Sequence, residues 1–234
     1  METNKISTLK KTARFAGLLY FIWVISGIYG LVYVPSQTLV PGDAFATANK
    51  ILENEFVFRT GIINGIIGNA LWVLIGLTLY RLFKQVNERQ AILLVILVII
   101  QIPAVFFMEA LNITSLMIIK GDLLKTFELS QRQDLAMLLL KMKNHILIIL
   151  EMFWGLWLFP FGLLVYKSGF IPRILGVFLI INGIAYVIHC FTHLLLPNHQ
   201  ALVFKIATPI WTLGEISIML WLLVKGVKNN SFHD

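Results

Sequence analysis

Residues 174–196, ILGVFLIINGIAYVIHCFTHLLL, form an apolar run without a single Asp, Glu, Lys or Arg. A helix needs about 20 predominantly apolar residues to cross the hydrocarbon core of a bilayer. The run therefore predicts a transmembrane helix. Its two histidines, His189 and His193, are four positions apart, close to one helical turn, so they share a helix face.

Five further apolar blocks of similar length accompany this run. The whole chain is 58% hydrophobic and only 13% charged, whereas an average soluble domain carries about 25% charged residues. A helix satisfies its backbone hydrogen bonds internally, as the hydrocarbon core requires. We therefore predict an all-α polytopic integral membrane protein, a six-transmembrane-helix bundle that forms one domain over residues 1–234. The predicted spans are about 15–34, 57–80, 91–119, 143–166, 174–196 and 203–224.

The positions of lysine and arginine predict how these helices are oriented. If the N-terminus is cytoplasmic, eleven of the 19 basic residues lie on the inner side and eight on the outer side. The inner connections are also short and basic, whereas the outer ones are longer and contain acidic residues. The positive-inside rule then predicts a multi-pass protein of the cell inner (cytoplasmic) membrane with both termini cytoplasmic. This placement explains the net charge of +7 without nucleic acid as a partner.

Two outer connections are predicted to contain helices. Residues 41–56, PGDAFATANKILENEF, begin with a Pro-Gly turn and the capping residue Asp43, and their apolar residues recur near helical spacing. We expect a short interfacial helix on the membrane surface. In the other connection, Ser130 and Gln133 fit a capping box, so a helix is expected to start there and to continue into the fourth span.

Ionisable and amide residues inside the spans are the candidate functional residues. An Asp, Lys or Arg at the centre of a membrane helix costs about 2.5–3.5 kcal/mol on insertion scales, so such groups usually face the bundle interior. The predicted topology places most of them in the outer half of the membrane, where we expect an outward-facing polar pocket. The candidates for a ligand-binding or proton-linked role are Glu109, Glu151, Glu215, Asn64, Asn112 and His189. A structural role is equally consistent with the three glutamates, for example through pairing with Arg59.

Three functional hypotheses follow. The first is a module that binds or transports a small or amphipathic ligand, with membrane lipids around it and the glutamates as proton-linked groups. The alternative is a metal-dependent intramembrane hydrolase, in which His189 and His193 hold zinc with His145 or Glu151 as third ligand. The third is a structural or accessory membrane protein. Haem ligation would require two well-placed histidine pairs, and only one exists, so no cofactor is expected.

Sequence signatures of soluble enzymes are absent from the chain. It contains no Gly-rich phosphate loop, no G-x-S-x-G elbow and no H-E-x-x-H motif. The H-x-x-x-H spacing is weak evidence for a metal because many helices contain it by chance. The sequence therefore favours a protein that is not an enzyme, and it identifies no catalytic residue.

Three stretches of the chain resemble a known family. They are VPGDAFATANKILENEFVFRTGI (40–62), KSGFIPRILGVFLIINGIAYVI (167–188) and LGEISIMLWLLVKGVK (213–228). Together they resemble the bacterial multi-pass membrane family known as domain of unknown function 4386, and the resemblance covers nearly the whole chain. It implies a single bundle of six membrane helices, and it implies no activity, cofactor or catalytic residue.

Overall fold

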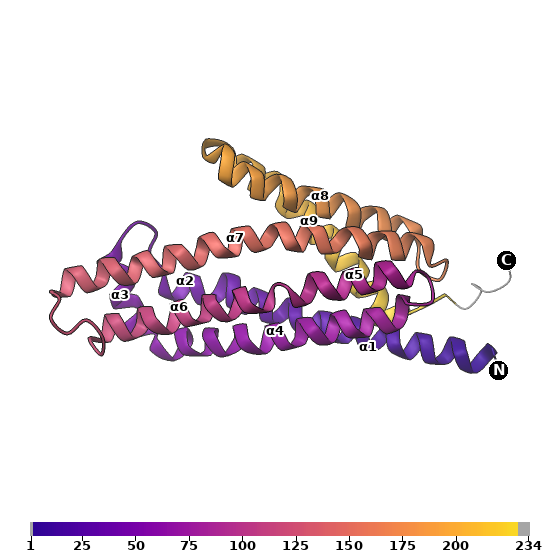
Figure 1. Cartoon of the computed structure of the whole chain (residues 1–234), viewed down its shortest axis with the longest axis horizontal. Coiled ribbons are helices and arrows are strands. Elements are labelled where there is room, and N and C mark those ends of the chain that lie inside the picture. Colours follow the sequence, from indigo (N-terminus) through magenta and orange to yellow (C-terminus); the bar gives the residue numbers. More distant parts are fainter. Residues whose placement is uncertain (1, 229–234) are drawn as a thin grey trace. The chain divides into compact units, whose positions relative to one another are not determined.

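The computed structural model describes residues 2–228, with side chains from residue 6 onward, and these residues form helices and no strand. Six helical stretches are long and apolar enough to cross a membrane: Ile6–Thr38, Glu55–Phe83, Glu88–Lys120, Leu129–Lys167, Arg173–Leu195 and Pro197–Lys225. The predicted all-α fold with six apolar spans is thus confirmed (Figure 1). The α-helices of the described residues are α1 (Glu2–Ile28), α2 (Val34–Thr38), α3 (Ala44–Glu53), α4 (Glu55–Phe83), α5 (Glu88–Ile99), α6 (Ile102–Lys120), α7 (Leu129–Lys167), α8 (Arg173–Leu195) and α9 (Gln200–Leu220).

The sequence pattern predicts a single helix for the third span, but the structure has two. Helix α5 ends at Ile99 and α6 begins at Ile102. Pro103 explains the interruption, because proline has no backbone N–H and its ring clashes with the preceding turn. Two side chains donate to carbonyls at the break: Gln101 Nε2 donates to the Leu97 carbonyl (2.5 Å), and Asn69 Nδ2 of α4 donates to the Ile102 carbonyl (3.4 Å).

The helix of the fourth span begins at Leu129, next to the start predicted near Ser130, and continues without a break. Helix α7 starts at Leu129 and includes the whole span to Lys167, as expected. The predicted capping box at Ser130 and Gln133 is wrong, however. The backbone N–H of Glu128 donates to Gln131 Oε1 (3.0 Å), which places the cap two residues earlier.

The chain packs as two compact units, and each is described by itself. The first comprises the described residues of Met1–Ile22, Leu71–Gln101 and Ile148–Asp234, so it contains α5, α8, α9 and parts of α1, α4 and α7. The second comprises Trp23–Ala70 and Ile102–Leu147, so it contains α2, α3, α6 and the other parts of α1, α4 and α7. A single domain over the whole chain stays a prediction.

In the first unit, glycines bring α7 and α8 into backbone contact. A Cβ atom at Gly155 would lie 2.7 Å from the carbonyl oxygen of Gly183, and a Cβ at Gly183 would lie 2.7 Å from that of Gly155. Gly162 and Gly176 face each other in the same way, at 2.7 and 2.6 Å. On each helix the two glycines are seven residues apart, about two turns. Such small residues allow membrane helices to approach closely.

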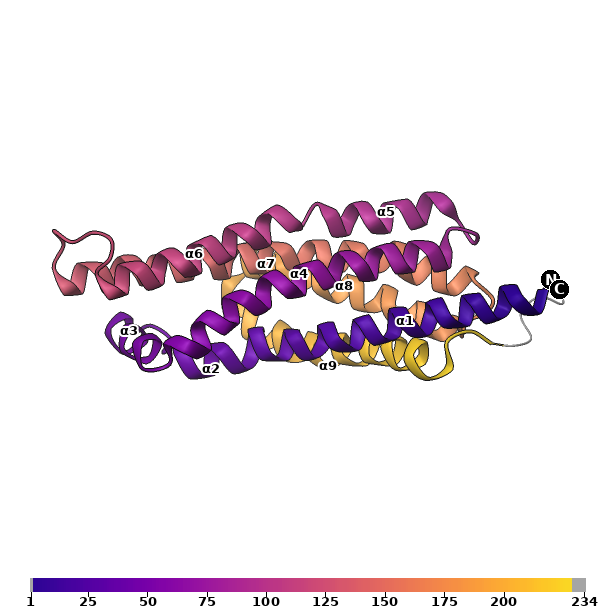
Figure 2. The same cartoon turned by 90° about the horizontal axis from the view of Figure 1, so that it is seen from below.

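Connections that are predicted to share one side of the membrane meet at one end of the first unit. Phe83 at the end of α4 stacks on Phe170 between α7 and α8, with 5.8 Å between ring centroids. The N–H of Lys228 donates to the Phe170 carbonyl (2.9 Å). The first-unit part of α1 meets the C-terminal end of α9 and the π-helical turn after it, Trp221–Lys225 (Figure 2), where Arg14 Nη2 donates to the Val224 carbonyl (3.0 Å). The last described residues are thus tied both to α1 and to the connection between α7 and α8.

The second unit contains the predicted helix between the first two spans. This helix, α3, is capped by Asp43, whose Oδ1 accepts from the N–H of Ala46 (2.8 Å). One face of α3 is buried through Ile51 and packs against α2 and α6. The other face is apolar too, yet Phe45 and Leu52 are 61% and 43% exposed. The predicted position of this helix on the membrane surface stays a prediction.

Glycines of α4 face neighbouring helices in the second unit. A Cβ at Gly61 would lie 2.9 Å from the side chain of Val34. Gly65 faces the carboxyl group of Glu109, and no Cβ would fit between the two. The missing side chain at Gly65 therefore provides the space in which the Glu109 carboxyl group lies.

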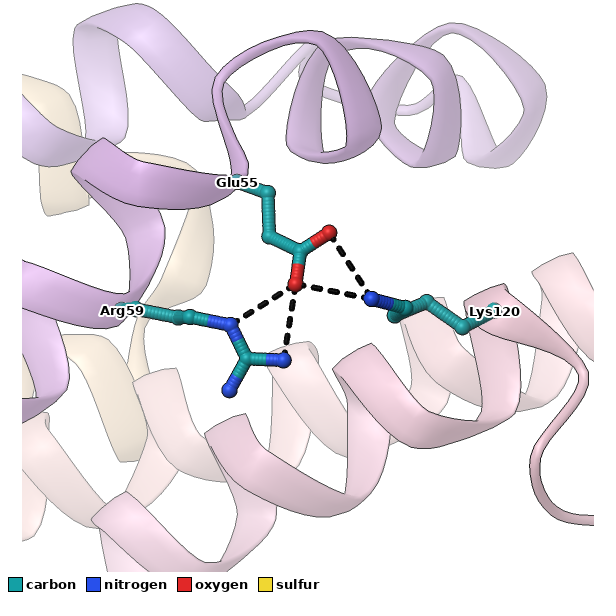
Figure 3. A network of polar contacts seen from close by, with 3 residues as sticks. All are labelled: Glu55, Arg59 and Lys120. Atoms are coloured by element: carbon teal, nitrogen blue, oxygen red, sulfur yellow. Dashed lines mark hydrogen bonds and ion pairs between the residues drawn. The ribbon is translucent and has the colours of Figure 1, made fainter.

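At the start of α4, Glu55 joins two basic side chains (Figure 3). Its carboxylate accepts from Arg59 Nε (2.7 Å) and from Lys120 Nζ of α6 (2.9 and 3.0 Å). These side chains are well exposed, so the network contributes little stability. The expectation that Arg59 pairs with a glutamate inside the spans is wrong. Arg59 pairs instead with Glu55, which lies four residues earlier on the same helix face.

Replacing Gly183 by alanine tests the contact between α7 and α8. The added Cβ would press on the Gly155 carbonyl, and such overpacking costs about 1–3 kcal/mol. We expect Gly183→Ala to lower the thermal unfolding midpoint of the purified protein in lipid nanodiscs.

Gly27 provides the matched control, because a Cβ there would meet nothing within 4 Å. Gly27→Ala should leave the midpoint unchanged or raise it, since alanine is favoured over glycine in a helix by about 0.5–1 kcal/mol. Equal midpoints for the two variants would contradict the close approach of α7 and α8.

Candidate functional site

Glu215 on α9 is held by donors from α1 and α8. The hydroxyl of Tyr20 donates to Oε2 (2.8 Å), the hydroxyl of Tyr186 donates to Oε1 (2.9 Å), and Asn182 Nδ2 lies 3.5 Å from Oε1. Asn182 Nδ2 also donates to the carbonyl of Trp211 (3.3 Å). Tyr20 and Asn182 are completely buried. We call these side chains the Glu215 cluster; both carboxylate oxygens are hydrogen-bonded, and the contacts tie three helices together.

The spacing of the residues along two helices explains why they meet. Asn182, Tyr186 and His189 follow each other at intervals of four and three residues, so they lie on one face of α8. Trp211 and Glu215 are four residues apart on one face of α9. Because these two faces point toward each other, the polar groups of α8 and α9 are brought together inside the first unit.

Glu151 on α7 and His189 on α8 form a second buried polar contact. His189 Nδ1 lies 2.5 Å from Glu151 Oε2, and the two side chains are 2% and 12% exposed. With Glu151 ionised, its carboxylate only accepts, and the proton of this contact then lies on Nδ1 of the histidine. Glu151 lies about one turn before Gly155, and His189 follows Gly183 by fewer than two turns. The glycine contact therefore sets the separation of the helices at this pair.

Aromatic rings of α8 and α9 surround the Glu151–His189 pair. The His189 ring is edge-on to Trp211, with centroids 5.2 Å apart and 81° between the planes, and it lies 5.6 Å from the ring of Phe204. Trp211 stacks in turn on Tyr186 (4.4 Å, 8°). The pair and the Glu215 cluster are thus joined by ring packing.

The Glu151–His189 pair lies beside buried polar atoms that have no hydrogen-bond partner among the described residues. In the part of the chain that the structure describes, His189 Nε2 is buried without a hydrogen-bond partner, and so is Nε1 of the adjacent Trp211. A buried polar atom without a partner costs about 1–3 kcal/mol. Such atoms require an explanation, for example a functional role. We therefore take the Glu151–His189 pair as the candidate site and the Glu215 carboxylate, whose two oxygens both accept hydrogen bonds, as a structural clamp. Within the Glu215 cluster, Asn182 Oδ1 also has no partner among the described residues.

Glu109 lies in the second unit, in a different environment. The residue is only 7% exposed, and Asn112 Nδ2 donates to its Oε2 (2.8 Å). Lys143 of α7 interacts electrostatically with the carboxyl group. A buried charge that has both a hydrogen-bond donor and an opposite charge is compensated. The surroundings of Glu109 and Asn112 therefore favour a structural role.

The other predicted site residues make contacts of their own or belong to the second unit. Asn64 accepts from the hydroxyl of Ser26 (2.8 Å) and donates to the Ser26 carbonyl (3.0 Å), which joins α1 to α4. His193 is half-buried on α8, in the same unit as His189, whereas His145 belongs to the second unit. Among residues 6–228, no group of three or more His, Cys, Asp and Glu side chains is placed to hold a metal ion. The geometry therefore lends no support to a zinc-dependent hydrolase.

Sequence reasoning missed the aromatic residues that complete the site. For Tyr186 a signal exists, because it lies one turn from both Asn182 and His189 on the same face of α8. For Tyr20 there is none, since its partner Glu215 lies 195 residues further along the chain. Only the packed structure reveals that a tyrosine of the first span reaches the glutamate of the last.

Replacing Tyr186 by phenylalanine tests the clamp. The variant loses the hydroxyl that donates to Glu215 but keeps the ring that stacks on Trp211. A hydrogen bond to a charged group contributes about 1.5–3 kcal/mol, so we expect Tyr186→Phe to lower the thermal midpoint in nanodiscs. The half-exposed Tyr166 of α7 (44%) offers the control, and Tyr166→Phe should change the midpoint little. The same midpoint for both variants would show that Glu215 does not hold α8 and α9 together.

Comparison with known proteins agrees with the resemblance of the sequence. The family model described as Domain of unknown function (DUF4386) matches residues 15–226, nearly the whole chain. No curated protein and no solved structure gives a significant match. With six apolar helical spans and a match over almost its full length, this multi-pass membrane protein belongs to the DUF4386 family.

Proposed function

We propose that the protein is a proton-linked membrane module that binds or transports a small amphipathic ligand at the Glu151–His189 pair. The observation that carries the proposal is the 2.5 Å contact between Glu151 Oε2 and His189 Nδ1, which leaves His189 Nε2 buried and without a partner among the described residues. An imidazole and a carboxylate in contact hold a proton between them and can exchange it near neutral pH.

The surroundings of the pair support an amphipathic ligand. His189 and Trp211 are mostly hidden, but Phe204, whose ring contacts both, is 50% exposed. The pair thus lies directly behind an apolar outer surface of α8 and α9. In a membrane-spanning helix such a surface faces lipid, so an amphiphile reaches the pair from the bilayer.

The titratable groups around the pair limit which residues could make ligand binding depend on pH. On α8, His193, Cys190 and Tyr186 interact electrostatically with Glu151. On α9, the acidic group is Glu215, which is occupied by its tyrosine donors. Of these groups, only the histidines have an ordinary pKa near neutrality. A pH dependence that disappears when Glu151 is replaced is therefore assigned to the Glu151–His189 pair.

The test compares the affinity of amphiphiles at about pH 5.5 and about pH 8, on either side of the ordinary histidine pKa. The probes are cetyl alcohol, lysophosphatidylcholine and cetyltrimethylammonium, whose own headgroups do not titrate in this interval. Each is radiolabelled and partitioned between nanodiscs with and without the protein. We expect the affinity of at least one probe to change several-fold with pH in the wild type, and the change to disappear in Glu151→Gln.

The control is Glu53→Gln, which removes an exposed carboxylate at the end of α3 and should keep the wild-type pH dependence. If no probe binds more tightly to protein-containing nanodiscs at either pH, the proposed function is wrong. A pH dependence that survives in Glu151→Gln would assign the proton linkage to another group.

We also propose that both termini face the cytoplasm, with the protein in the inner membrane. The sequence bias of eleven inner against eight outer basic residues supports this orientation. Two of the eight outer cations, Arg59 and Lys120, are paired with Glu55. The positive-inside rule counts the basic residues themselves, so this pairing leaves the difference between the two sides unchanged.

Cysteine labelling in intact cells tests the orientation. Against a Cys190→Ala background, Gln85→Cys lies in the connection between α4 and α5, and Lys125→Cys lies between α6 and α7; both positions are exposed. We expect a membrane-impermeant maleimide to label Lys125→Cys in intact cells and Gln85→Cys only after lysis. The reverse pattern would invert the proposed topology.

A further inference from the structure

Two neighbouring side chains offer complementary hydrogen-bonding atoms with nothing bound to them. His189 Nδ1 faces Glu151 as a donor, so the neutral imidazole presents Nε2 as an acceptor. Trp211 Nε1–H can only donate. In the described part of the chain, both atoms are buried and neither has a hydrogen-bond partner. Their rings are in edge contact, 5.2 Å between centroids, across the interface of α8 and α9.

A group that both donates and accepts satisfies this pair of atoms. A hydroxyl donates its proton to Nε2 and accepts from Nε1–H. A protonated carboxyl group does the same through two oxygens, since its O–H donates and its C=O accepts. An ester only accepts and leaves Nε2 without a partner, and a quaternary ammonium neither donates nor accepts a hydrogen bond. The atom types therefore discriminate between headgroups.

The third ring of this group indicates where an apolar chain would lie. Phe204 contacts His189 (5.6 Å) and Trp211 (5.9 Å) and is 50% exposed on the outer surface of α9. An apolar chain that extends from the headgroup toward the bilayer would pass over this ring. The ligand then has an oxygen-bearing head in the protein and a hydrocarbon tail in the lipid.

We propose that His189 Nε2 and Trp211 Nε1 bind the hydroxyl or protonated carboxyl headgroup of a single-chain amphiphile whose tail lies against Phe204. The inference rests on the proposed function and specifies its ligand class. It excludes permanently cationic amphiphiles and esters of the same chain length. Glu151 acts on this ligand only through His189, because it fixes the tautomer that presents Nε2 as an acceptor.

The experiment compares four probes with the same hydrocarbon chain: palmitic acid, cetyl alcohol, methyl palmitate and cetyltrimethylammonium. Retention by nanodiscs that contain the protein, above retention by empty nanodiscs, gives the affinity at about pH 7, where a neutral imidazole presents Nε2 as an acceptor and burial in the bilayer keeps part of the fatty acid protonated. We expect the acid and the alcohol to bind about tenfold or more tightly than the ester and the cation, the equivalent of about 1.4 kcal/mol.

Trp211→Phe tests the donor while keeping an aromatic ring against Tyr186. We expect this variant to bind the acid and the alcohol about two- to tenfold more weakly, since one hydrogen bond is lost and Nε2 keeps its own. The matched control is Trp221→Phe. Trp221 also has a buried Nε1 without a partner in the described structure, but it lies in the π-helical turn after α9. The Trp221→Phe variant should bind the probes as the wild type does.

The binding of the four probes to the wild-type protein can overturn the inference without any variant. If the ester or the cation binds as tightly as the acid and the alcohol, the assignment of the headgroup is wrong. If the cation binds with a pH dependence that Glu151→Gln removes, the proton-linked function stands and only the ligand class falls. Equal effects of Trp211→Phe and Trp221→Phe would remove Trp211 from the site. If none of the amphiphiles binds at any pH tested, both proposals fail.

Discussion

The close contact of α7 and α8 through glycine is the constraint on which the candidate site depends. Inside a bilayer, lipid is as apolar as the helix surfaces, so packing and hydrogen bonds hold helices together rather than the hydrophobic effect. Gly155 and Gly162 lie against Gly183 and Gly176 so closely that a Cβ at any of the four would come within 2.7 Å of a carbonyl oxygen of the facing helix. At that separation a glutamate on one helix reaches a histidine on the other directly, which produces the Glu151–His189 pair.

Two carboxyl groups of the first unit, Glu215 and Glu151, differ in their hydrogen bonding. Glu215 receives phenol donors on both oxygens, and the contacts stabilise α1, α8 and α9 against one another. The Glu151–His189 pair uses one nitrogen of the imidazole and leaves the other buried without a partner, beside an equally unpartnered indole of Trp211, among the described residues. A carboxylate inside a membrane costs free energy, and in a structural role its oxygens must be hydrogen-bonded. The Glu151–His189 pair is therefore the better candidate for binding.

Local patterns predict most of the fold, because a membrane span is a local property of length and hydropathy. All six spans were evident, and so was the helix behind the capping residue Asp43. The break before Pro103 had a visible signal in the proline itself, but the pattern of apolar residues alone hides it. The site was harder to predict. His189 was identifiable as a polar residue in a span, but its pairing with Glu151 depends on the register of α7 and α8. That register is set by the four glycines at which α7 and α8 touch. Nothing in the sequence distinguishes these glycines from the others, and their role is evident only from the contact itself.

The protonation state of His189 tests the central claim most directly. Solid-state NMR of the protein in bilayers, with ¹⁵N-labelled histidine, separates protonated from unprotonated ring nitrogens, and the spectrum of His189→Gln identifies the signals of this residue. The structure predicts a protonated Nδ1 in a strong hydrogen bond to a carboxylate and an unprotonated Nε2 at neutral pH. An unprotonated Nδ1 with the proton on Nε2, or signals of a freely exchanging imidazole, would contradict the Glu151–His189 pair and with it the account of the site.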